Sequence, residues 1–268
     1  MSTSESPTYE SLTGFLRQYN KAAIAFSGGV DSTFLLQAAR DALGKDNVLA
    51  LTVNSPYIPA WEIKEAQELA NRLQIRQIIV NAGIADTIRN NPKDRCYLCK
   101  TFIFNMLKEV ATTHGFDQVM DGTNAGDSEA ERPGMKALKE LGIISPLKET
   151  GFTKKEIRQH SKIKNLPTWE KPAYACLLTR LPYDKRIDQE NLRKIEKSEK
   201  YLIDMGIRAV RVRVHDNLAR IETSQENIER ILSGNLMSKI TRQLKRHGFQ
   251  YVTIDMEGYR TGSNKGIF

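Results

Sequence analysis

A short glycine-containing stretch near the N-terminus has the composition of an anion-binding loop. The stretch AFSGGVDST, residues 25–33, continues the apolar run AAIAF and leads into the helical pattern TFLLQAARDAL. Gly28 and Gly29 permit a tight turn that directs backbone N–H groups at an anion, and the following helix adds the positive end of its dipole. Ser27 and Ser32 supply hydroxyl donors for phosphate oxygens. We therefore expect a phosphate-bearing ligand at this loop.

The spacing of this loop separates it from two common nucleotide-binding motifs. No Gly-Lys-Ser/Thr follows the glycines, as it would in a Walker loop, and the Gly-x-Gly-x-x-Gly pattern of dinucleotide sites is missing. An ordinary strand–helix turn is the alternative. The pattern SGGVDS after a buried strand resembles the PP-loop of the ATP pyrophosphatases, which bind the pyrophosphate of ATP and transfer AMP to a substrate oxygen.

Two further stretches extend this resemblance. DGTNAGD, residues 121–127, follows an apolar run and resembles the DGTN segment of the same superfamily. Asn54 and Ser55 end another predicted strand, where that superfamily places contacts to the nucleotide. The resemblance implies ATP with Mg²⁺ as the ligand. The residues implied to bind ATP are Ser27, Gly28, Gly29, Asp31, Ser32, Asn54 and Gly122.

The three cysteines form the second group of residues that could carry chemistry. Cys96 and Cys99 lie in DRCYLCK and Cys176 lies in AYACLLTR. Four interpretations stay open: a thioredoxin-type pair, a zinc site completed by His114 or His160, three unrelated buried thiols, and a [4Fe-4S] cluster with one iron left without a protein ligand. Three thiolates without a fourth suit the cluster, because sulfur ligands favour iron–sulfur centres.

The elements that must position these residues alternate between strands and helices through the first 150 residues. AAIAFSG, NVLALTVNS, RQIIVNAG and DQVMDGTN have the apolar content of buried strands, and the segments between them have apolar residues at helical spacing. Such alternation predicts an α/β fold with a doubly wound parallel sheet, whose ligands bind at the carboxyl ends of the strands.

The C-terminal third follows a different pattern. DQENLRKIEKSEKYLIDMG predicts an amphipathic helix, and AVRVRVHDNLARIET predicts a hairpin that turns at Asp216 and Asn217. We therefore expect two domains: residues 1–186, a PP-loop domain including a basic cysteine-bearing loop, and residues 187–268, a small α+β domain for substrate binding or oligomerisation.

Charge is concentrated in the middle of the chain. The formal net charge is +8, and residues 154–186 carry nine Lys and Arg against three Asp and Glu. A nucleic acid, a small polyanionic substrate or a solvated basic surface would each account for this excess. The N-terminus is polar and acidic, and no stretch approaches the ~20 apolar residues of a membrane span, so we expect a cytoplasmic protein without a membrane partner.

Six segments together resemble one family: AFSGGVDST, NPKDRCYLCK, RPGMKALKELG, KPAYACLLTRLPY, VRVRVHDNLARIE and GFQYVTIDMEGYRTG. They are similar to the LarE family, the ATP-dependent sulfur transferases of nickel-pincer nucleotide biosynthesis. The resemblance implies that both carboxylates of pyridinium-3,5-biscarboxylic acid mononucleotide are adenylated and converted to thiocarboxylates in turn. It also implies a trimer-based homo-oligomer.

The resemblance implies roles for the cysteines and for several charged residues. One style of the family sacrifices the sulfur of a cysteine matching Cys176. In the other style, cysteines similar to Cys96, Cys99 and Cys176 hold a [4Fe-4S] cluster that receives sulfur from sulfide or another sulfur donor. This sequence has all three cysteines, so the resemblance favours the cluster style. The residues implied to bind substrate are Arg180, Arg211, Arg213, Glu199 and Glu222. The alternatives are a solvated sheet face for Arg211 and Arg213, an exposed helix acid for Glu199 and a salt-bridge partner for Glu222.

Three other functions compete with this one. A tRNA thiolation enzyme would also combine a PP-loop with three cysteines. The C-terminal domain, however, does not resemble an RNA-binding module and its aromatic–basic interleaving is sparse, so we do not expect a nucleic acid partner. An amide-forming synthetase of the NAD synthetase type leaves the cysteines unexplained. A nucleotide sensor would bind ATP without releasing pyrophosphate.

Overall fold

The computed structural model describes residues 6–128, 133–233 and 235–259. By its contacts the chain divides into two compact units, one formed by Met1–Ile88 and Asp94–Lys171 and the other by Arg89–Lys93 and Pro172–Phe268. Among the described residues, no helix combines the length and the hydropathy that a membrane-spanning segment requires.

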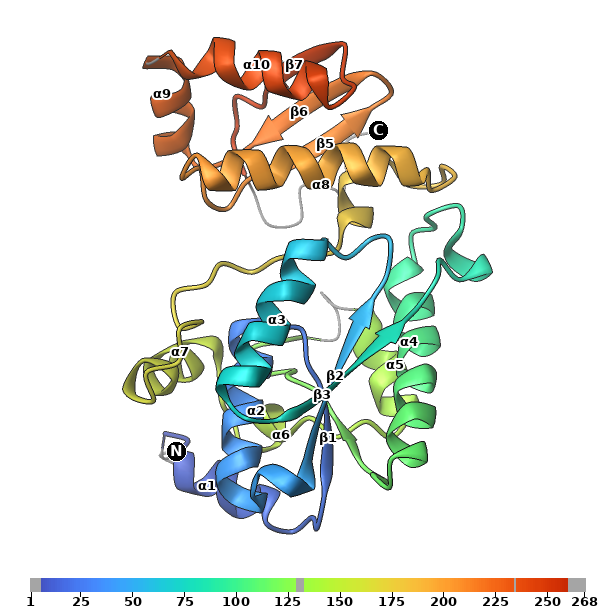
Figure 1. Ribbon diagram of the computed structural model, residues 1–268, viewed down its shortest axis with the longest axis vertical. Coiled ribbons are helices and arrows are strands. Elements are labelled where there is room, and N and C mark those ends of the chain that lie inside the picture. Colours follow the sequence, from blue (N-terminus) through green and yellow to red (C-terminus); the bar gives the residue numbers. More distant parts are fainter. Residues whose placement is uncertain (1–5, 129–132, 234, 260–268) are drawn as a thin grey trace. The chain divides into compact units, whose positions relative to one another are not determined.

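The first unit is built on a four-stranded parallel sheet in the order β3-β2-β1-β4 (Figure 1). Its strands are β1 (Ala22–Ala25), β2 (Val48–Asn54), β3 (Arg76–Asn81) and β4 (Val119–Met120). Its helices are α1 (Tyr9–Leu16), α2 (Val30–Leu43), α3 (Ala60–Arg72), α4 (Arg95–Thr113), α5 (Gly134–Glu140), α6 (Pro146–Glu149) and α7 (Lys154–Ile163), with the short helices η1 (Lys45–Asn47) and η2 (Asp86–Ile88) between them. The α/β class and the parallel sheet expected from the sequence are confirmed.

Alternation along the central strands puts side chains into two separate cores. Ile24 of β1 packs in a cluster with residues of α1, α2, α3 and α7, while its neighbour Ala23 packs with residues of α4 and α5. Since successive strand side chains point to opposite faces, the continuous apolar runs of the sequence follow from helices covering both faces. Figure 1 shows α2 and α3 on one side of the sheet and α4 and α5 on the other.

The second unit is a three-stranded sheet in the order β5-β6-β7 covered by helices. The strands β5 (Arg211–His215) and β6 (Leu218–Glu222) form the expected antiparallel hairpin, and β7 (Tyr251–Ile254) pairs parallel to β6. Its helices are η3 (Leu177–Arg180), α8 (Gln189–Asp204), α9 (Gln225–Ser233) and α10 (Leu236–Arg246). Asp216 occupies the turn with a φ of 50°, in the left-handed region that Asp tolerates better than most residues.

The cysteine-bearing loop belongs to this second unit by its contacts. Sequence analysis placed residues 172–186 with the first domain, whereas the contacts divide the chain after Lys171. The segment Arg89–Lys93 joins the second unit because the side-chain amide of Asn91 donates to the carbonyl of Pro182 at 2.8 Å and the amide of Ile187 donates to the carbonyl of Arg89.

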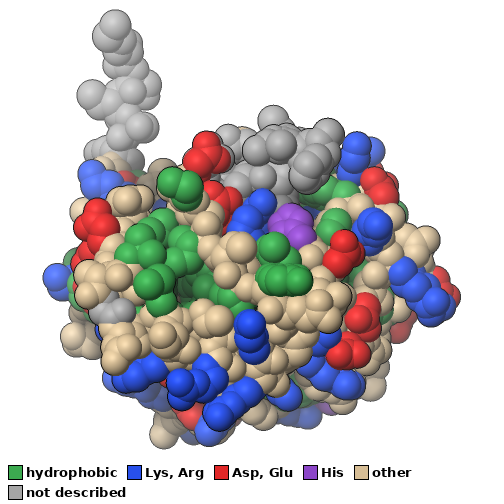
Figure 2. Space-filling view, turned by 90° about the horizontal axis from the view of Figure 1, so that it is seen from above, with side chains coloured by type: hydrophobic (Ala, Val, Ile, Leu, Met, Phe, Trp, Pro, Cys, Tyr) green, Lys and Arg blue, Asp and Glu red, His purple; other side chains and the backbone are tan. Residues whose placement is uncertain are grey.

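The surface of the second unit includes several large apolar side chains. Leu232, Met237, Tyr251 and Met256 are about half exposed or more, and Met256 is 92% exposed. On the face drawn in Figure 2, Lys and Arg side chains are interspersed with Asp, Glu and hydrophobic side chains.

Candidate active site

The glycine loop joins the end of β1 to the start of α2. Gly28 has a φ of 67°, and a Cβ atom at this position would lie 3.1 Å from the Cα of Ala66 in α3. The loop therefore requires glycine for its conformation and for its close approach to a neighbouring helix. Gly29 occupies the N-cap position of α2, so the free N–H groups of the first helical turn open at the loop.

The two serines of the loop face each other. Their hydroxyl oxygens are 3.2 Å apart, and the backbone N–H of Ser27 donates to the hydroxyl of Ser32 at 3.3 Å. The hydroxyl of Ser32 also lies 3.3 Å from the carbonyl of Gly29. Backbone N–H groups and rotatable hydroxyls thus gather at a helix N-terminus, which is a favourable arrangement for phosphate oxygens.

The DGTN segment lies directly beside this helix N-terminus. A Cβ atom on Gly122 would lie 3.0 Å from the backbone nitrogen of Ser32, so a larger residue would push the two segments apart. The buried carboxylate of Asp121 accepts hydrogen bonds from the hydroxyls of Thr123 and Ser145, the latter at 2.6 Å. These bonds fix the segment at the carboxyl end of β4.

Asn54 marks the corresponding position on β2. It is paired in register with Asn81 of β3, and its side-chain amide donates to the Oδ1 of Asn81 at 2.8 Å. Both side chains are exposed at the carboxyl ends of adjacent parallel strands, at the edge of the sheet where ligands of such folds bind. The predicted nucleotide residues of the first unit therefore lie at this edge, in the loop that begins there, or in the first turn of α2.

Two lysines reach the glycine loop from distant positions, and sequence analysis did not single them out. The Nζ of Lys154, at the start of α7, donates to the Oδ2 of Asp31 in the first turn of α2. The Nζ of Lys171 donates to the carbonyl of Gly28 at 2.8 Å and pairs with Glu65 of α3 at 2.7 Å. Their only sequence signal is the excess of positive charge in residues 154–186.

Cys96 and Cys99 lie in the first two turns of α4. Residues three apart on a helix share a face, so the two thiols are directed to the same side. Cys96 is exposed, Cys99 is half-buried, and the sulfur of Cys99 is 3.2 Å from the hydroxyl of Tyr57. Neither cysteine forms a disulfide, so both sulfurs keep the thiol chemistry that an iron–sulfur centre requires.

Cys176 lies in the second unit, where it is the N-cap residue of the short helix η3. It is half-buried and, like Cys96 and Cys99, forms no disulfide, so the three thiols are of the ligand type that a [4Fe-4S] cluster takes. Within the described ranges, no three His, Cys, Asp or Glu side chains are gathered as a metal site.

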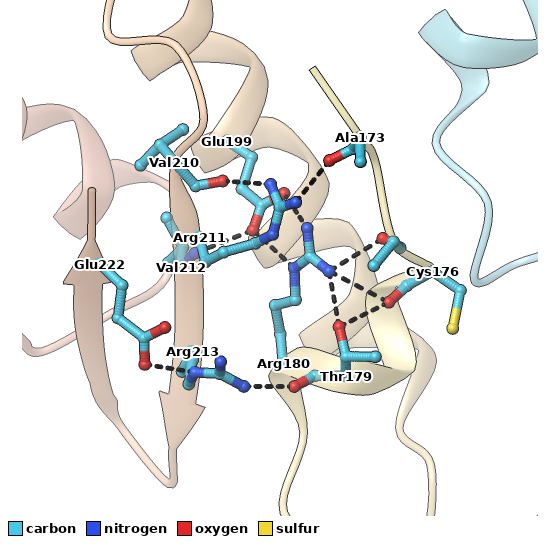
Figure 3. Close-up of polar contacts among 11 residues, drawn as sticks. Ala173, Cys176, Thr179, Arg180, Glu199, Val210, Arg211, Val212, Arg213 and Glu222 are labelled. Atoms are coloured by element: carbon cyan, nitrogen blue, oxygen red, sulfur yellow. Dashed lines mark hydrogen bonds and ion pairs between the residues drawn. The ribbon is translucent and has the colours of Figure 1, made fainter. Parts of the chain in front are cut away.

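Arg180 fastens the cysteine loop to α8 (Figure 3). Its guanidinium makes two hydrogen bonds to the carboxylate of Glu199, at 2.8 and 3.0 Å, and a further bond to the carbonyl of Cys176 at 3.2 Å. Arg180 and Glu199 are 2% and 4% exposed. Such a paired fork of two bonds satisfies both buried charges, and it defines the backbone conformation next to Cys176.

Arg211 and Arg213 hold the same loop from β5. Arg211 donates to the carbonyl of Ala173 at 2.8 Å, and Arg213 donates to the carbonyl of Thr179 at 2.6 Å (Figure 3). The Nε of Arg213 pairs with the carboxylate of Glu222 in β6. Both arginines are at most 7% exposed, so the alternative of a solvated sheet face is wrong for this pair.

The two acidic residues are equally enclosed. Glu199 also accepts a hydrogen bond from the backbone N–H of Val212 at 2.8 Å, and Glu222, 1% exposed, accepts one from Arg220 at 2.9 Å.

Burial lowers the pKa of Arg211 from its ordinary value, and the charge of nearby Arg180 lowers that pKa further. Positive charge is thus crowded around the cysteine loop, with two carboxylates stabilising it.

Similarity to known proteins extends along almost the whole chain. A family model described as NAD synthase matches residues 9–98, which include the glycine loop. The chain is 39% identical over 255 residues to an uncharacterized protein of Synechocystis sp., covering 94% of this chain and 95% of that protein. It is 36% identical over 253 residues to the pyridinium-3,5-bisthiocarboxylic acid mononucleotide synthase of Lactiplantibacillus plantarum, covering 94% and 91%. It is 34% identical to an uncharacterized protein of Methanocaldococcus jannaschii, covering 90% and 91%.

Proposed function

Because the chain belongs to the family of the pyridinium-3,5-bisthiocarboxylic acid mononucleotide synthase, the LarE family, we propose that it replaces oxygen by sulfur in the carboxylates of pyridinium-3,5-biscarboxylic acid mononucleotide. The protein is an ATP-dependent sulfurtransferase of the PP-loop type. The observation that carries the proposal is the match along 94% of the chain, which includes the glycine loop and the arginine-fastened cysteine loop.

The first step is adenylation of a substrate carboxylate. The N–H groups and hydroxyls of Ser27, Gly28, Gly29 and Ser32 bind the pyrophosphate portion of ATP with Mg²⁺, while Asn54 and Gly122 line the nucleotide's position at the strand ends. A carboxylate oxygen attacks the α-phosphorus, the bond to the bridging oxygen breaks, and pyrophosphate leaves with both electrons. Stabilising the departing charge is the task for which backbone donors at a helix N-terminus are suited.

The second step replaces the adenylate by sulfur. A sulfur nucleophile attacks the carbonyl carbon of the acyl adenylate, and AMP leaves with the bonding electrons. When bound, a [4Fe-4S] cluster held by Cys96, Cys99 and Cys176 would supply an iron without a protein ligand for an exogenous sulfide or sulfur donor. The competing source is the sulfur of Cys176 itself, whose loss leaves dehydroalanine.

The buried arginines serve this reaction by fixing the cysteine loop and by concentrating positive charge beside it. Arg180, Arg211 and Arg213 each donate to a backbone carbonyl of residues 173–179. A substrate with two carboxylates and a phosphate complements that charge, and planar guanidinium groups are suited to both anions. Glu199 and Glu222 keep the guanidinium groups oriented.

The proposal includes two further expectations about the protein in the cell. Cysteines that form no disulfide suit a reducing cytoplasm. The large exposed apolar side chains of α9, α10 and the β7 region suit contacts in a homo-oligomer, for which sedimentation of the purified protein is the test.

Pyrophosphate release with different acceptors tests the proposed function. We expect the release of pyrophosphate from ATP and Mg²⁺ to depend on the dicarboxylate mononucleotide. We expect no release when the mononucleotide is replaced by tRNA, or by ammonia together with a monocarboxylate acceptor. Release that requires tRNA would establish tRNA thiolation instead, and release only with ammonia would indicate an amide-forming synthetase. ATP binding without release under any of these conditions would indicate a nucleotide sensor.

A further inference from the structure

The side chain of Lys171 contacts the glycine loop and the neighbouring helix α3. Its Nζ lies 2.8 Å from the carbonyl oxygen of Gly28 and 2.7 Å from the Oε2 of Glu65. The side chain is only 12% exposed. A hydrogen bond from a largely buried charged donor is among the stronger polar contacts in a protein, so the Gly28 carbonyl is held firmly in one direction.

The backbone of Lys171 is fixed independently of its side chain. Arg158 of α7 donates from one guanidinium nitrogen to the carbonyl of Trp169 and from the other to the carbonyl of Lys171, the latter at 2.9 Å. Lys171 therefore approaches the glycine loop from a segment that is tied to a helix of the same unit.

The Gly28 carbonyl is the critical atom of the loop because its peptide joins two glycines. Neither Gly28 nor Gly29 has a Cβ to resist rotation of the peptide plane between them, and Gly28 already has a positive φ of 67°. Rotation of this plane would exchange the direction of the Gly28 carbonyl with that of the Gly29 N–H, which in this structure donates to the hydroxyl of Ser27 at 3.4 Å. An anion cradle needs the N–H inside and the carbonyl outside.

We propose that Lys171 is a positioning residue that holds the Gly28–Gly29 peptide with its N–H group directed to the phosphates of ATP, a proposal that rests on the proposed function. The glycine loop contains no lysine. The cation that contacts its backbone belongs to Lys171, which is 143 residues away from Gly28 in the sequence. Glu65 keeps the ammonium group between α3 and the carbonyl, and in this way directs it at the loop.

Direct contact of Lys171 with phosphate would make the opposite prediction for Glu65. If Lys171 acted by its charge on the phosphates, removal of the Glu65 carboxylate would free that charge and strengthen ATP binding. If Lys171 acts by holding the peptide, removal of the carboxylate makes the ammonium group more mobile, so that its bond to the Gly28 carbonyl and the binding of ATP both weaken. Glu65→Gln therefore separates the two roles by the sign of the change.

The test compares equilibrium binding of ATP and of adenosine to the full chain, together with pyrophosphate release. The variants are Lys171→Met, Lys171→Arg and Glu65→Gln, with Lys155→Met as the control, since Lys155 is an exposed lysine of the neighbouring helix α7. We expect Lys171→Met to weaken ATP binding about ten- to a hundredfold, the effect of losing one charge-assisted bond. Adenosine has no phosphate, so its binding should be unchanged.

The other three variants test whether the effect depends on a cation at position 171 and on its pairing with Glu65. Lys171→Arg, which keeps a cationic donor, should restore most of the ATP affinity, Glu65→Gln should weaken it to a smaller extent, and Lys155→Met should match the wild-type protein. Equal loss of ATP and adenosine binding in Lys171→Met, or stronger ATP binding in Glu65→Gln, would overturn the positioning role. A wild-type protein that releases no pyrophosphate would overturn the proposed function first, whereas wild-type behaviour of Lys171→Met would overturn this inference alone.

Discussion

The two proposed anion-binding regions, one in each unit, differ in the kind of donor they contain. In the first unit the donors are backbone N–H groups and serine hydroxyls at the start of α2, gathered within six residues, 27–32. In the second unit they are the guanidinium groups of Arg180, Arg211 and Arg213, which are buried and already bound to carboxylates and carbonyls. The donors of the backbone cradle are neighbours in the chain, although Lys171 contacts the loop from a distance, while each charge of the buried network depends on a partner of opposite charge.

This difference separates the expected effects of substitution. Changes in the glycine loop should impair nucleotide chemistry and leave folding largely intact, because few buried contacts are lost. Changes in the arginine network should lower stability as well, because an unpaired charge remains in the interior. Measuring stability and activity together on both units therefore tests the comparison.

The largest expected effect is on stability, from Arg180→Ala. The substitution leaves the carboxylate of Glu199 buried without its forked partner, so we expect the free energy of unfolding to fall by about 3–5 kcal/mol. Chemical denaturation measures the change. Arg186→Ala is the matched control, because Arg186 is an exposed arginine after the same loop and should change stability by less than about 0.5 kcal/mol. Equal stability of the two variants would remove the distinction between the units.

The next effect is on nucleotide chemistry, from Ser32→Ala and Asp31→Ala. Each removes a polar group from the first turn of α2, and we expect pyrophosphate release to fall at least about ten- to a hundredfold, with an unfolding free energy within about 1 kcal/mol of wild type. Asp46→Ala, at an exposed acidic residue beyond the other end of α2, is the control. Full release in both loop variants would contradict the assignment of the nucleotide site.

Arg213→Ala should affect substrate more than nucleotide. Arg213 and Arg220 share the carboxylate of Glu222, but only Arg213 donates to the carbonyl of Thr179 in the cysteine loop. Calorimetry should show about tenfold weaker binding of the dicarboxylate mononucleotide and nearly unchanged ATP binding. Arg220→Ala is the matched control, and a similar loss in both variants would assign the effect to Glu222 instead of the cysteine loop.

The smallest effect is a pH dependence of the second unit. Burial lowers the pKa of His215, and the charges of Arg220 and Arg213 lower it further. The native state favours neutral imidazole, so this contribution to stability is fully present above the ordinary pKa of about 6.5 and is lost as the pH falls toward the lowered pKa. Denaturation at pH about 7.5 and about 5.5 should show a smaller loss for His215→Gln than for wild type, and identical losses would contradict this explanation.

The sequence predicts those features whose causes are local. The strands appear as apolar runs because helices cover both faces of the sheet, and the glycine loop appears as a motif because its donors are neighbours in the chain. The turn at Asp216 and Asn217 is likewise visible from strict alternation on both sides.

The features that the sequence does not predict depend on pairs far apart in the chain. Lys171 and Gly28 are 143 residues apart, and an isolated lysine has no spacing that reveals its partner. The pairing of Arg180 with Glu199 crosses from a loop to a helix, and it draws residues 172–186 into the second unit, where the sequence offered only a change of pattern.

The central claim is that this protein delivers sulfur to an adenylated carboxylate, and mass spectrometry of the substrate and the protein tests it most directly. Anaerobic protein, supplied with ATP, Mg²⁺, sulfide and the dicarboxylate mononucleotide, should give a product in which sulfur has replaced carboxylate oxygen. With the cluster as the route, many products should form per chain and the mass of the protein should be unchanged. An unaltered mononucleotide, despite pyrophosphate release, would contradict the account.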